Sequence, residues 1–344
     1  MFYFSDCPVF ASSRGEVGNM DAQQSTAEAY EEPPVKPLLD IDGQISHLKA
    51  KGVTFNLCDE AKAARYLTER TYFFKLAAYR VLFDRRIGGP RDGQYVNLDF
   101  GHLIELASFD CDLRYAFLPL TLDVEHAART KLMRIVAERT DEDGYSIVRD
   151  YMQGLNHNER RRREGEINML AADIFCGDLV GKYGRLAEMP IWVLMELFSF
   201  GSFINLYLFC AKRWNDKDMQ REHYMLRQAK SIRNACAHSS DIINGIALRG
   251  SPVTTDPVIW AAISKAGVSR RVRATKMRNP RTQQIVTLLH LHCQLITEGS
   301  GRDAAVQSMR DLSRHMEELL DRFSGNDSVR SFLVFLKSIV DSWF

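Results

Sequence analysis

The chain has 344 residues, enough to bury a large core, and its 45% hydrophobic and 26% charged residues are the balance of a folded globular protein. The net charge of +1 gives no overall attraction to nucleic acid, so an anionic partner needs a local basic patch. Seven cysteines without a C-x-x-C pair argue against a disulfide framework and a zinc ribbon, and we expect reduced thiols.

The N-terminal part leads from a polar stretch into helices. Residues 1–35 are small and polar and end in prolines, a composition that predicts a disordered leader. They lack the features of a signal peptide, and the chain has no apolar run of about 18 residues, so we expect a cytoplasmic protein without membrane contact. Residues 36–100 form the predicted N-terminal helical region, in which Gly52 ends one helix and Asp59 caps the next.

The middle of the chain, residues 101–250, is predicted as a helical core. Its first segment is periodic, and we expect two helices that meet near Pro119, because proline interrupts the hydrogen bonds of a helix. The run PIWVLMELFSFGSFINLYLFC, residues 190–210, is apolar on nearly all sides, which predicts one buried helix that begins at Pro190. A further helix carries SIRNACAHSS, residues 231–240.

The last region, residues 251–344, is predicted as a basic loop followed by helices at roughly 281–297, 303–323 and 327–344. Alternation typical of strands is almost absent from the sequence, and no repeat of about 20 to 50 residues stands out. The predicted fold class is therefore all-α.

Residues 231–240 place an arginine, an asparagine and a histidine within six positions of a core-forming segment. On a helix that turns about 100° per residue, Asn234 and His238 share a face, whereas Arg233 lies about 140° from His238. One chain can direct both side chains at one point only if the helix ends near His238. The alternative is that a second copy of the motif completes the site.

This trio suits the cleavage of RNA. A neutral imidazole can take the proton of a ribose 2′-hydroxyl, a guanidinium can hold the phosphate and its developing charge, and an amide can orient either group. Such a reaction needs neither metal nor cofactor. The ordinary interpretation is a solvated Arg233, an Asn234 that ends the helix and a His238 near the core, and composition leaves both interpretations open.

Six blocks of sequence, in a fixed order, carry a family resemblance. They are KPLLDIDGQISHLKAKGV, YFFKLAAYRVLF, FDCDLRYAFLPLTLDVEHAARTKL, PIWVLMELFSFGSFINLYLFC, IRNACAHSSDIING and FLVFLKSIVDSWF. Over residues 36–344 the chain resembles the abortive-infection (Abi) proteins of the AbiD and AbiF type.

The resemblance implies an all-α fold with a HEPN ribonuclease core and additional N-terminal and C-terminal helices. Arg233, Asn234 and His238 match the catalytic R-x-x-x-x-H motif of that core. A phage-defence toxin is implied, which damages cellular or phage RNA as a metal-independent endoribonuclease and leaves 2′,3′-cyclic phosphate ends. The implied partners are a second copy, in a homodimer that pairs two motifs, and a small structured non-coding RNA that restrains the toxin.

The match is incomplete just after the motif. Many relatives read RNxCAHHxRLWNR, whereas here Ser239 replaces the second histidine, Asp241 replaces the following arginine, and only Asn244 of that tail persists. If the lost groups help relatives to bind or cleave RNA, activity here is weak or differently targeted. Upstream, Glu125 and Arg129 match the Glu-x-x-x-Arg of the family, and one helical turn apart they predict a structural ion pair rather than a catalytic addition.

Two basic segments are candidate RNA contacts, because phosphate contacts supply most sequence-independent affinity for nucleic acid. Residues 265–281 carry seven basic side chains and no acidic one, and glutamates flank the second segment. The alternative for each is a solvated charged loop. The expected contacts are Arg270, Arg271, Arg273, Lys276, Arg278 and Arg281 in the first segment and Arg161 and Arg162 in the second.

Three functions stay open on the sequence: the endoribonuclease, a non-catalytic helical protein that holds structured RNA, and an assembly or sensor protein that uses the apolar helix at 190–210. A cysteine nucleophile fits poorly, because Cys236 and His238 diverge by about 200° on a helix. No metal site is expected, since His290 and His292 face different directions on their predicted helix.

Overall fold

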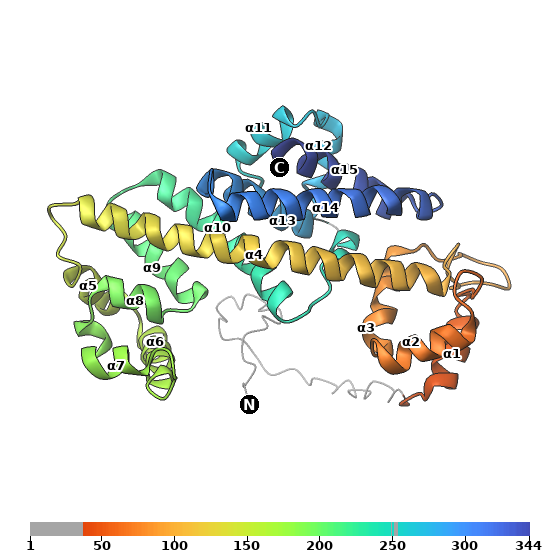
Figure 1. The fold of residues 1–344 in the computed structure, drawn as a ribbon, viewed down its shortest axis with the longest axis horizontal. Coiled ribbons are helices and arrows are strands. Elements are labelled where there is room, and N and C mark those ends of the chain that lie inside the picture. The colour runs from red at the N-terminus through yellow and green to blue at the C-terminus, as the bar shows by residue number, and fades with distance from the viewer. Residues whose placement is uncertain (1–36, 249, 251–253) are drawn as a thin grey trace, which may run out of the picture. The chain divides into compact units, whose positions relative to one another are not determined.

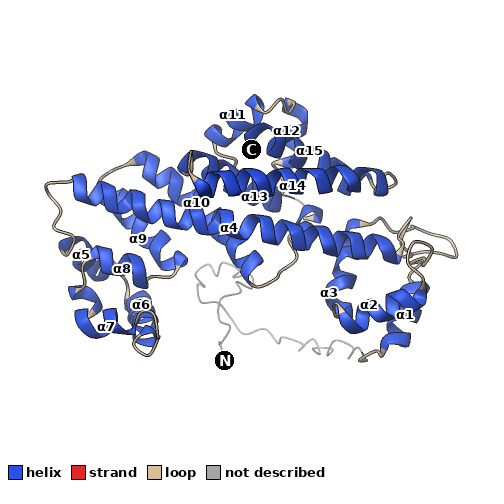
Figure 2. Cartoon of the chain, in the orientation of Figure 1, coloured by secondary structure: helices blue, strands red, loops and turns tan. Residues whose placement is uncertain are grey.

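Every regular element in the described part of the chain is a helix, which confirms the predicted all-α class (Figures 1 and 2). The computed structural model describes residues 37–248, 250 and 254–344, and the predicted leader at residues 1–35 lies outside them. Residues 40–344 form one compact unit. The α-helices are α1 (Ile41–Ala50), α2 (Glu60–Glu69), α3 (Phe73–Ala78), α4 (Phe100–Glu138), α5 (Ser146–Gly154), α6 (His157–Leu170), α7 (Gly177–Tyr183), α8 (Ile191–Leu197), α9 (Phe200–Arg213), α10 (Lys217–Ala237), α11 (Pro257–Lys265), α12 (Arg270–Lys276), α13 (Pro280–Leu295), α14 (Ser300–Arg322) and α15 (Asp327–Trp343). The 3-10 helices are η1 (Tyr79–Leu82), η2 (Leu186–Glu188) and η3 (Ile243–Ala247).

Local signals in the sequence place the first two helices. The Asp59 side chain accepts a hydrogen bond from the backbone N–H of Lys62 at 2.8 Å, which confirms Asp59 as the cap of α2. Helix α1 ends at Ala50, and Gly52 follows with a φ of +81°, which confirms the predicted glycine stop. An added Cβ at Gly52 would lie 2.9 Å from the Cβ of Gln94, so the position also lacks room for a side chain.

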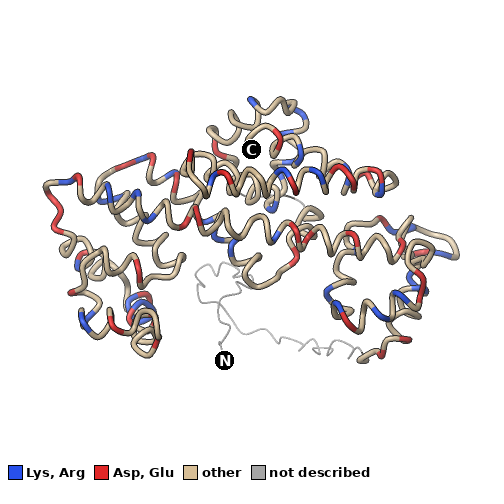
Figure 3. Tube along the Cα trace, viewed as in Figure 1, with Lys and Arg blue, Asp and Glu red and all other residues tan. Residues whose placement is uncertain are grey.

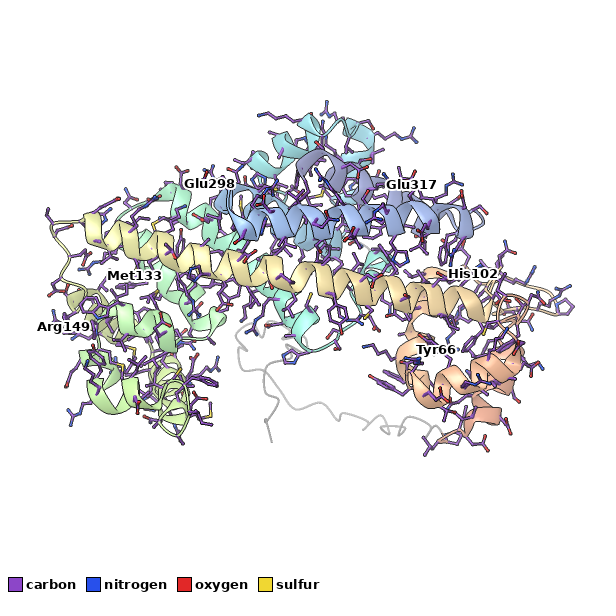
Figure 4. All side chains as sticks on the ribbon, in the orientation of Figure 1. Tyr66, His102, Met133, Arg149, Glu298 and Glu317 are labelled. Atoms are coloured by element: carbon purple, nitrogen blue, oxygen red, sulfur yellow. The ribbon has the colours of Figure 1, made fainter. Side chains whose placement is uncertain are left out.

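Helix α4 spans 39 residues, and the prediction of two helices meeting at Pro119 is wrong. Its start is fixed by a capping box, in which the Asp99 side chain accepts from Gly101 N at 2.8 Å. In return, the Nδ1 atom of His102, labelled in Figure 4, accepts from Asp99 N at 3.2 Å. Beyond this box the helix passes through the proline without a break.

The apolar face of α4 explains why Pro119 does not end the helix. Leu113 and Phe117 before the proline, and Leu120 and Val124 after it, are at most 1% exposed and belong to one buried row. A proline inside a helix costs about 3 kcal/mol, and full burial of each large apolar side chain stabilises by about 1.5–3 kcal/mol. The continuous buried row therefore outweighs the cost of the proline.

The apolar run at 190–210 is buried as predicted, but it forms two helices rather than one. Pro190 caps α8, and the chain breaks at Phe198 and Ser199 before α9 begins. The backbone N–H of Ser199 donates to Glu166 Oε1 at 2.9 Å instead of to the preceding helical turn. The run of apolar letters gave no sign of this break, because the partner that causes it lies 33 positions earlier in the chain.

Arg129 of α4 fills the break between α8 and α9. Its guanidinium donates to the backbone carbonyl of Met195, to that of Phe198 at 2.8 Å, and to Glu125 Oε1 at 2.6 Å. The last carbonyls of a helix have no partner within the helix, so an arginine from a neighbouring element can satisfy them. The ion pair expected between Glu125 and Arg129 is present, and it orients the guanidinium toward these carbonyls.

The C-terminal helices α13, α14 and α15 lie within a few residues of the predicted ranges and confirm them. The predicted basic loop is wrong for residues 270–276, because they form α12. Ser269 caps this helix by accepting from Val272 N at 3.3 Å, and Arg273 and Met277 turn inward. Because so many residues in this segment are basic, its short amphipathic pattern was not recognised in the sequence.

Helix α10 packs against α4, α9 and α13, and α14 runs alongside α4 and α15 (Figure 1). In α10, the residues Leu226, Ala229 and Ile232 are fully buried against α4, α9 and α13. Among the described residues, no helix combines the length and the apolar character that crossing a membrane requires. Helix α10 is therefore packed on three sides, whereas Ala237 and His238 at its C-terminal end are exposed.

Candidate functional site

The R-x-x-x-x-H motif lies at the C-terminal end of α10, and His238 is the capping residue of this helix. Ser240 N donates to Ala235 O at 2.8 Å and Ser239 N donates to Cys236 O at 3.2 Å, the two hydrogen bonds of a Schellman motif. Ser239 adopts the left-handed conformation that this motif requires, with a φ of +52°. The helix thus ends beside an exposed His238, which is the arrangement that a one-chain site requires.

Arg233 is drawn toward the face that His238 occupies. Its Nη1 atom lies 3.4 Å from Asn234 Oδ1, and Asn234 stands one helical turn before His238. Both Arg233 and Asn234 are partly buried, whereas His238 is exposed. Asn234 and His238 share a face of the helix, so Arg233 contacts a residue of the face on which His238 lies.

Asp110 of α4 anchors the backbone that follows the motif. Its carboxylate is fully buried, and Oδ1 accepts the backbone N–H groups of Ile242 at 2.8 Å and Ile243 at 2.7 Å. Oδ2 accepts from Arg114, one turn further along α4, and from the hydroxyl of Tyr79 at 3.1 Å. Burial raises the pKa of Asp110, and the donors around it oppose this shift. One buried carboxylate thus fixes two successive residues of the segment against α4.

Two residues from the N-terminal helices reach the same segment. The Tyr79 hydroxyl lies 3.2 Å from Asp241 Oδ1, and burial, followed by the neighbouring carboxylates, raises the pKa of Tyr79, so it stays a hydroxyl donor. Asp241 Oδ2 accepts from Asn244 Nδ2 at 3.2 Å, and Lys75 Nζ donates to the carbonyl of Ser239. Of the two residues that depart from the expected pattern, Asp241 is thus held through its side chain, whereas Ser239 is contacted at its backbone carbonyl.

Beneath the motif lie the buried Cys236 and the partly buried Arg281. Burial raises the pKa of the Cys236 thiol to about 12, which keeps it protonated and supports a packing role. Arg281 of α13 packs under η3, where an added Cβ at Gly245 would lie 2.7 Å from Arg281 Cβ. Burial lowers the pKa of Arg281, and its Nη1 donates to Gln284 Oε1 at 3.0 Å. Arg281 therefore supports the segment after the motif from below.

The other basic residues predicted in the 265–281 segment divide into two groups. Arg270, Arg271 and Arg278 are exposed, and Figure 3 shows basic positions gathered around α12. Arg273 is buried, with its guanidinium 5.3 Å from the centre of the Trp260 ring. Lys276 is partly buried and donates to Ser331 Oγ, and burial lowers its pKa. The surface that α12 offers to an anion is thus smaller than the sequence indicated.

Asn279 connects this basic surface to the segment after the motif. Its Nδ2 atom donates to the carbonyls of Gly245 at 2.9 Å, Ile246 at 3.2 Å and Leu248 at 2.7 Å. Its Oδ1 atom caps α13 by accepting from Thr282 N at 2.8 Å. The end of α12, the start of α13 and η3 are therefore held at one junction.

In the second predicted basic segment, Arg161 and Arg162 are exposed on α6. The arginines on either side of these two are engaged in the fold. Arg160 donates to the carbonyl of Met152 at 3.1 Å, and Arg163 pairs with Glu166 at 3.0 Å. Arg160 is exposed as well but is tied to backbone carbonyls, so Arg161 and Arg162 are the exposed arginines of this run that have no such contact in the described structure.

Sequence reasoning missed Asp110, Arg114, Tyr79 and Lys75. A signal was available for the first two, because Asp110 falls on the apolar row of α4 between Leu106 and Leu113, and Arg114 follows it by four positions. A carboxylate on a buried helical row needs a charged or hydrogen-bonding partner. Tyr79 and Lys75 gave no comparable signal, since their partners in the segment after the motif lie more than 160 positions away.

Comparison with known proteins adds one match. A family model described as Abi-like protein matches residues 65–244, more than half of the chain. The matched range runs from α2 into η3, so it includes Asp110, the motif at the end of α10 and the segment that Asp110 anchors. No curated protein and no solved structure matches the chain.

Proposed function

The chain belongs to the Abi-like protein family, and from this membership we propose that it acts in abortive infection by cleaving RNA as a metal-independent endoribonuclease. The end of α10 carries the proposal: the Schellman motif leaves His238 exposed at the cap, with Arg233 in contact with Asn234 one turn earlier. These are the chemical groups, on one helix end, that attack by a ribose 2′-hydroxyl requires.

In the proposed reaction His238 takes the proton of a ribose 2′-hydroxyl. The 2′-oxygen forms a bond to the adjacent phosphorus, and the bond from phosphorus to the 5′-oxygen breaks. One product ends in a 2′,3′-cyclic phosphate, and the other gains a proton on its 5′-oxygen and ends in a hydroxyl. Arg233 holds the non-bridging phosphate oxygens, whose negative charge grows in the transition state, and Asn234 Oδ1 lies 3.4 Å from Nη1 of its guanidinium and helps to orient it.

We further propose that two copies pair their motifs in a homodimer. His238 projects from the cap, and a second imidazole in the shared site would supply the proton that the leaving 5′-oxygen needs. A small structured RNA would restrain the protein through exposed arginines, namely Arg270, Arg271 and Arg278 around α12 and Arg161 and Arg162 on α6. Arg273, which is buried, and Arg281, which packs under η3, are assigned supporting roles instead.

The test is cleavage of RNA by the purified full-length protein in the presence of a chelator. We expect His238→Ala to lower the cleavage rate by a factor of about 10²–10⁴, the usual contribution of a positioned general base. His157→Ala, which removes another exposed histidine at the start of α6, is the matched control and should keep the wild-type rate. An RNA with one 2′-deoxyribose at the cleaved position should resist the wild-type protein.

Two results would contradict the proposed active site or the proposed activity. Unchanged cleavage by the His238→Ala protein would remove His238 from the active site. A wild-type protein that binds RNA but yields no cyclic phosphate ends would favour the non-catalytic RNA-binding alternative. In that case exchange of Arg270 and Arg271 for glutamate should abolish binding and flatten its dependence on salt.

A further inference from the structure

Along one face of α10 the residues are exposed or partly buried, because the neighbouring helices pack against its other sides. We define the α10 track as the residues that share this face with His238: Gln220, Tyr224, Arg227, Ser231 and Asn234. On a helix that turns about 100° per residue, all five lie within about 40° of the direction of His238. Tyr224 is 58% exposed, and Arg227 is exposed as well. The track therefore forms an accessible stripe that ends at the proposed catalytic histidine.

The charge of this stripe is positive. Between Gln220 and His238 the only acidic residue is Glu222, which is buried and accepts hydrogen bonds from Lys131 and from the Tyr207 hydroxyl at 2.8 Å. Arg227 lies on the stripe itself. Lys230 flanks it, where it crosses Gly201 of α9, and an added Cβ at Gly201 would lie 2.6 Å from its Nζ atom. No acidic side chain in this part of the helix offsets these cations at the surface.

Tyr224, the aromatic residue of the α10 track, packs against the buried ring of His223. The ring of Tyr224 meets the ring of His223 edge to face, with centroids 5.0 Å apart. His223 is itself buried, and its Nδ1 lies 3.1 Å from the carbonyl of Ile204 in α9. An exposed aromatic ring with a fixed neighbour is a suitable platform for stacking an unpaired nucleic-acid base.

We propose that the α10 track is the path along which a single strand of RNA enters the site. Arg227 holds a backbone phosphate, and Tyr224 stacks an unpaired base about 21 Å from His238, the length of 14 helical residues. A paired strand fits poorly, because the bases of a duplex are not free to stack on a side chain. The proposal rests on the proposed function for the identity of the ligand, and it names the single strand as the substrate class.

The test measures binding of a labelled single-stranded RNA oligonucleotide, and of the matching duplex, in full-length protein that carries His238→Ala to prevent cleavage. We expect Arg227→Gln to weaken single-strand binding and to lower its salt slope by about 0.7. Tyr224→Ala should weaken it about five- to 150-fold, and Tyr224→Phe, which keeps the ring, should retain it. Arg221→Gln is the matched control on the same helix, since Arg221 lies about 120° from Arg227 and pairs with Asp218.

The outcomes separate this proposal from the proposed function. Equal effects of Arg227→Gln and Arg221→Gln, or single-strand binding that survives Tyr224→Ala, would overturn the track. A change in molar mass of the Tyr224→Ala protein in light scattering would assign this face to a second copy and overturn it too. If the protein with His238 intact cleaves no RNA but the track variants lose binding, the track stands and the catalytic proposal fails.

Discussion

At the scale of single residues, Asp110 decides the position of the segment that follows the motif. Four donors surround its buried carboxylate, and two of them are successive backbone N–H groups. Asp110→Asn removes the charge that balances Arg114, which is itself largely buried, so we expect the free energy of unfolding to fall by about 3–5 kcal/mol. Urea denaturation of the wild type and the variant measures this difference.

Two variants separate the anchor from general damage to α4. Asp112→Asn, which changes a half-exposed carboxylate paired with His315, should cost less than about 1 kcal/mol. Tyr79→Phe removes a single donor from Asp110 and should cost about 1 kcal/mol while the protein stays folded. If Asp110 positions the site through the segment after the motif, Tyr79→Phe should lower the rate of RNA cleavage more than it lowers the affinity of the protein for RNA. Equal losses for Asp112→Asn and Asp110→Asn would contradict the anchor.

At the scale of secondary-structure elements, Arg129 joins α4 to the break between α8 and α9. Arg129→Ala leaves the carbonyls of Met195 and Phe198 without their donor and leaves Glu125 largely buried without its charge partner. We expect a loss of about 2–4 kcal/mol in the free energy of unfolding, measured with urea. Arg134→Ala on the same helix is the control. It breaks an exposed pair with Glu138, and a loss above about 1 kcal/mol there would show that α4 responds to any lost arginine.

At the scale of the whole molecule, three buried histidines and one partly buried histidine predict how stability depends on pH. Burial lowers the pKa of His102, His223, His290 and His292 below the ordinary value of 6.5. Below about pH 6.5 the unfolded chain binds protons at these rings and the folded chain does not. The contribution of these neutral rings to the free energy of unfolding is therefore fully present above that pH. It falls as the pH drops toward the folded pKa values, by up to about 1.4 kcal/mol per pH unit for each ring.

Chemical denaturation at intervals between pH 7.5 and pH 5 checks this slope. His290→Gln removes one of the four rings and should make the slope shallower, whereas His157→Gln, at an exposed position, should leave it unchanged. Carboxylates with a lowered pKa act at lower pH. Asp143, for example, is held at a pKa of about 2 by hydrogen bonds from Ser146 and contributes to the slope only below about pH 5. A stability that is flat between pH 7.5 and pH 5 would contradict the prediction.

The residues of the candidate site could be named from the sequence because their signals are local. Arg233, Asn234 and His238 lie within one and a half helical turns, and their spacing left two possibilities, a helix that ends near His238 or a second copy of the motif. The structure shows that the helix does end there. The anchor could not be predicted in the same way. Asp110 and Ile242 are 132 positions apart, and the sequence around either residue does not indicate that the two are hydrogen-bonded.

The sequence by itself determined the all-α class, the caps at Asp59 and Gly52, the C-terminal helices and the family, because each depends on backbone preferences or patterns read along the chain. Only the tertiary structure decided that α4 passes through Pro119, that the apolar run breaks at Ser199, and that Arg273 turns inward. In each case contacts that form only on folding act against the local preference: the buried row of α4, the bond from Ser199 to Glu166, and the Trp260 ring beside Arg273. The balance between these terms exists only once the chain is folded.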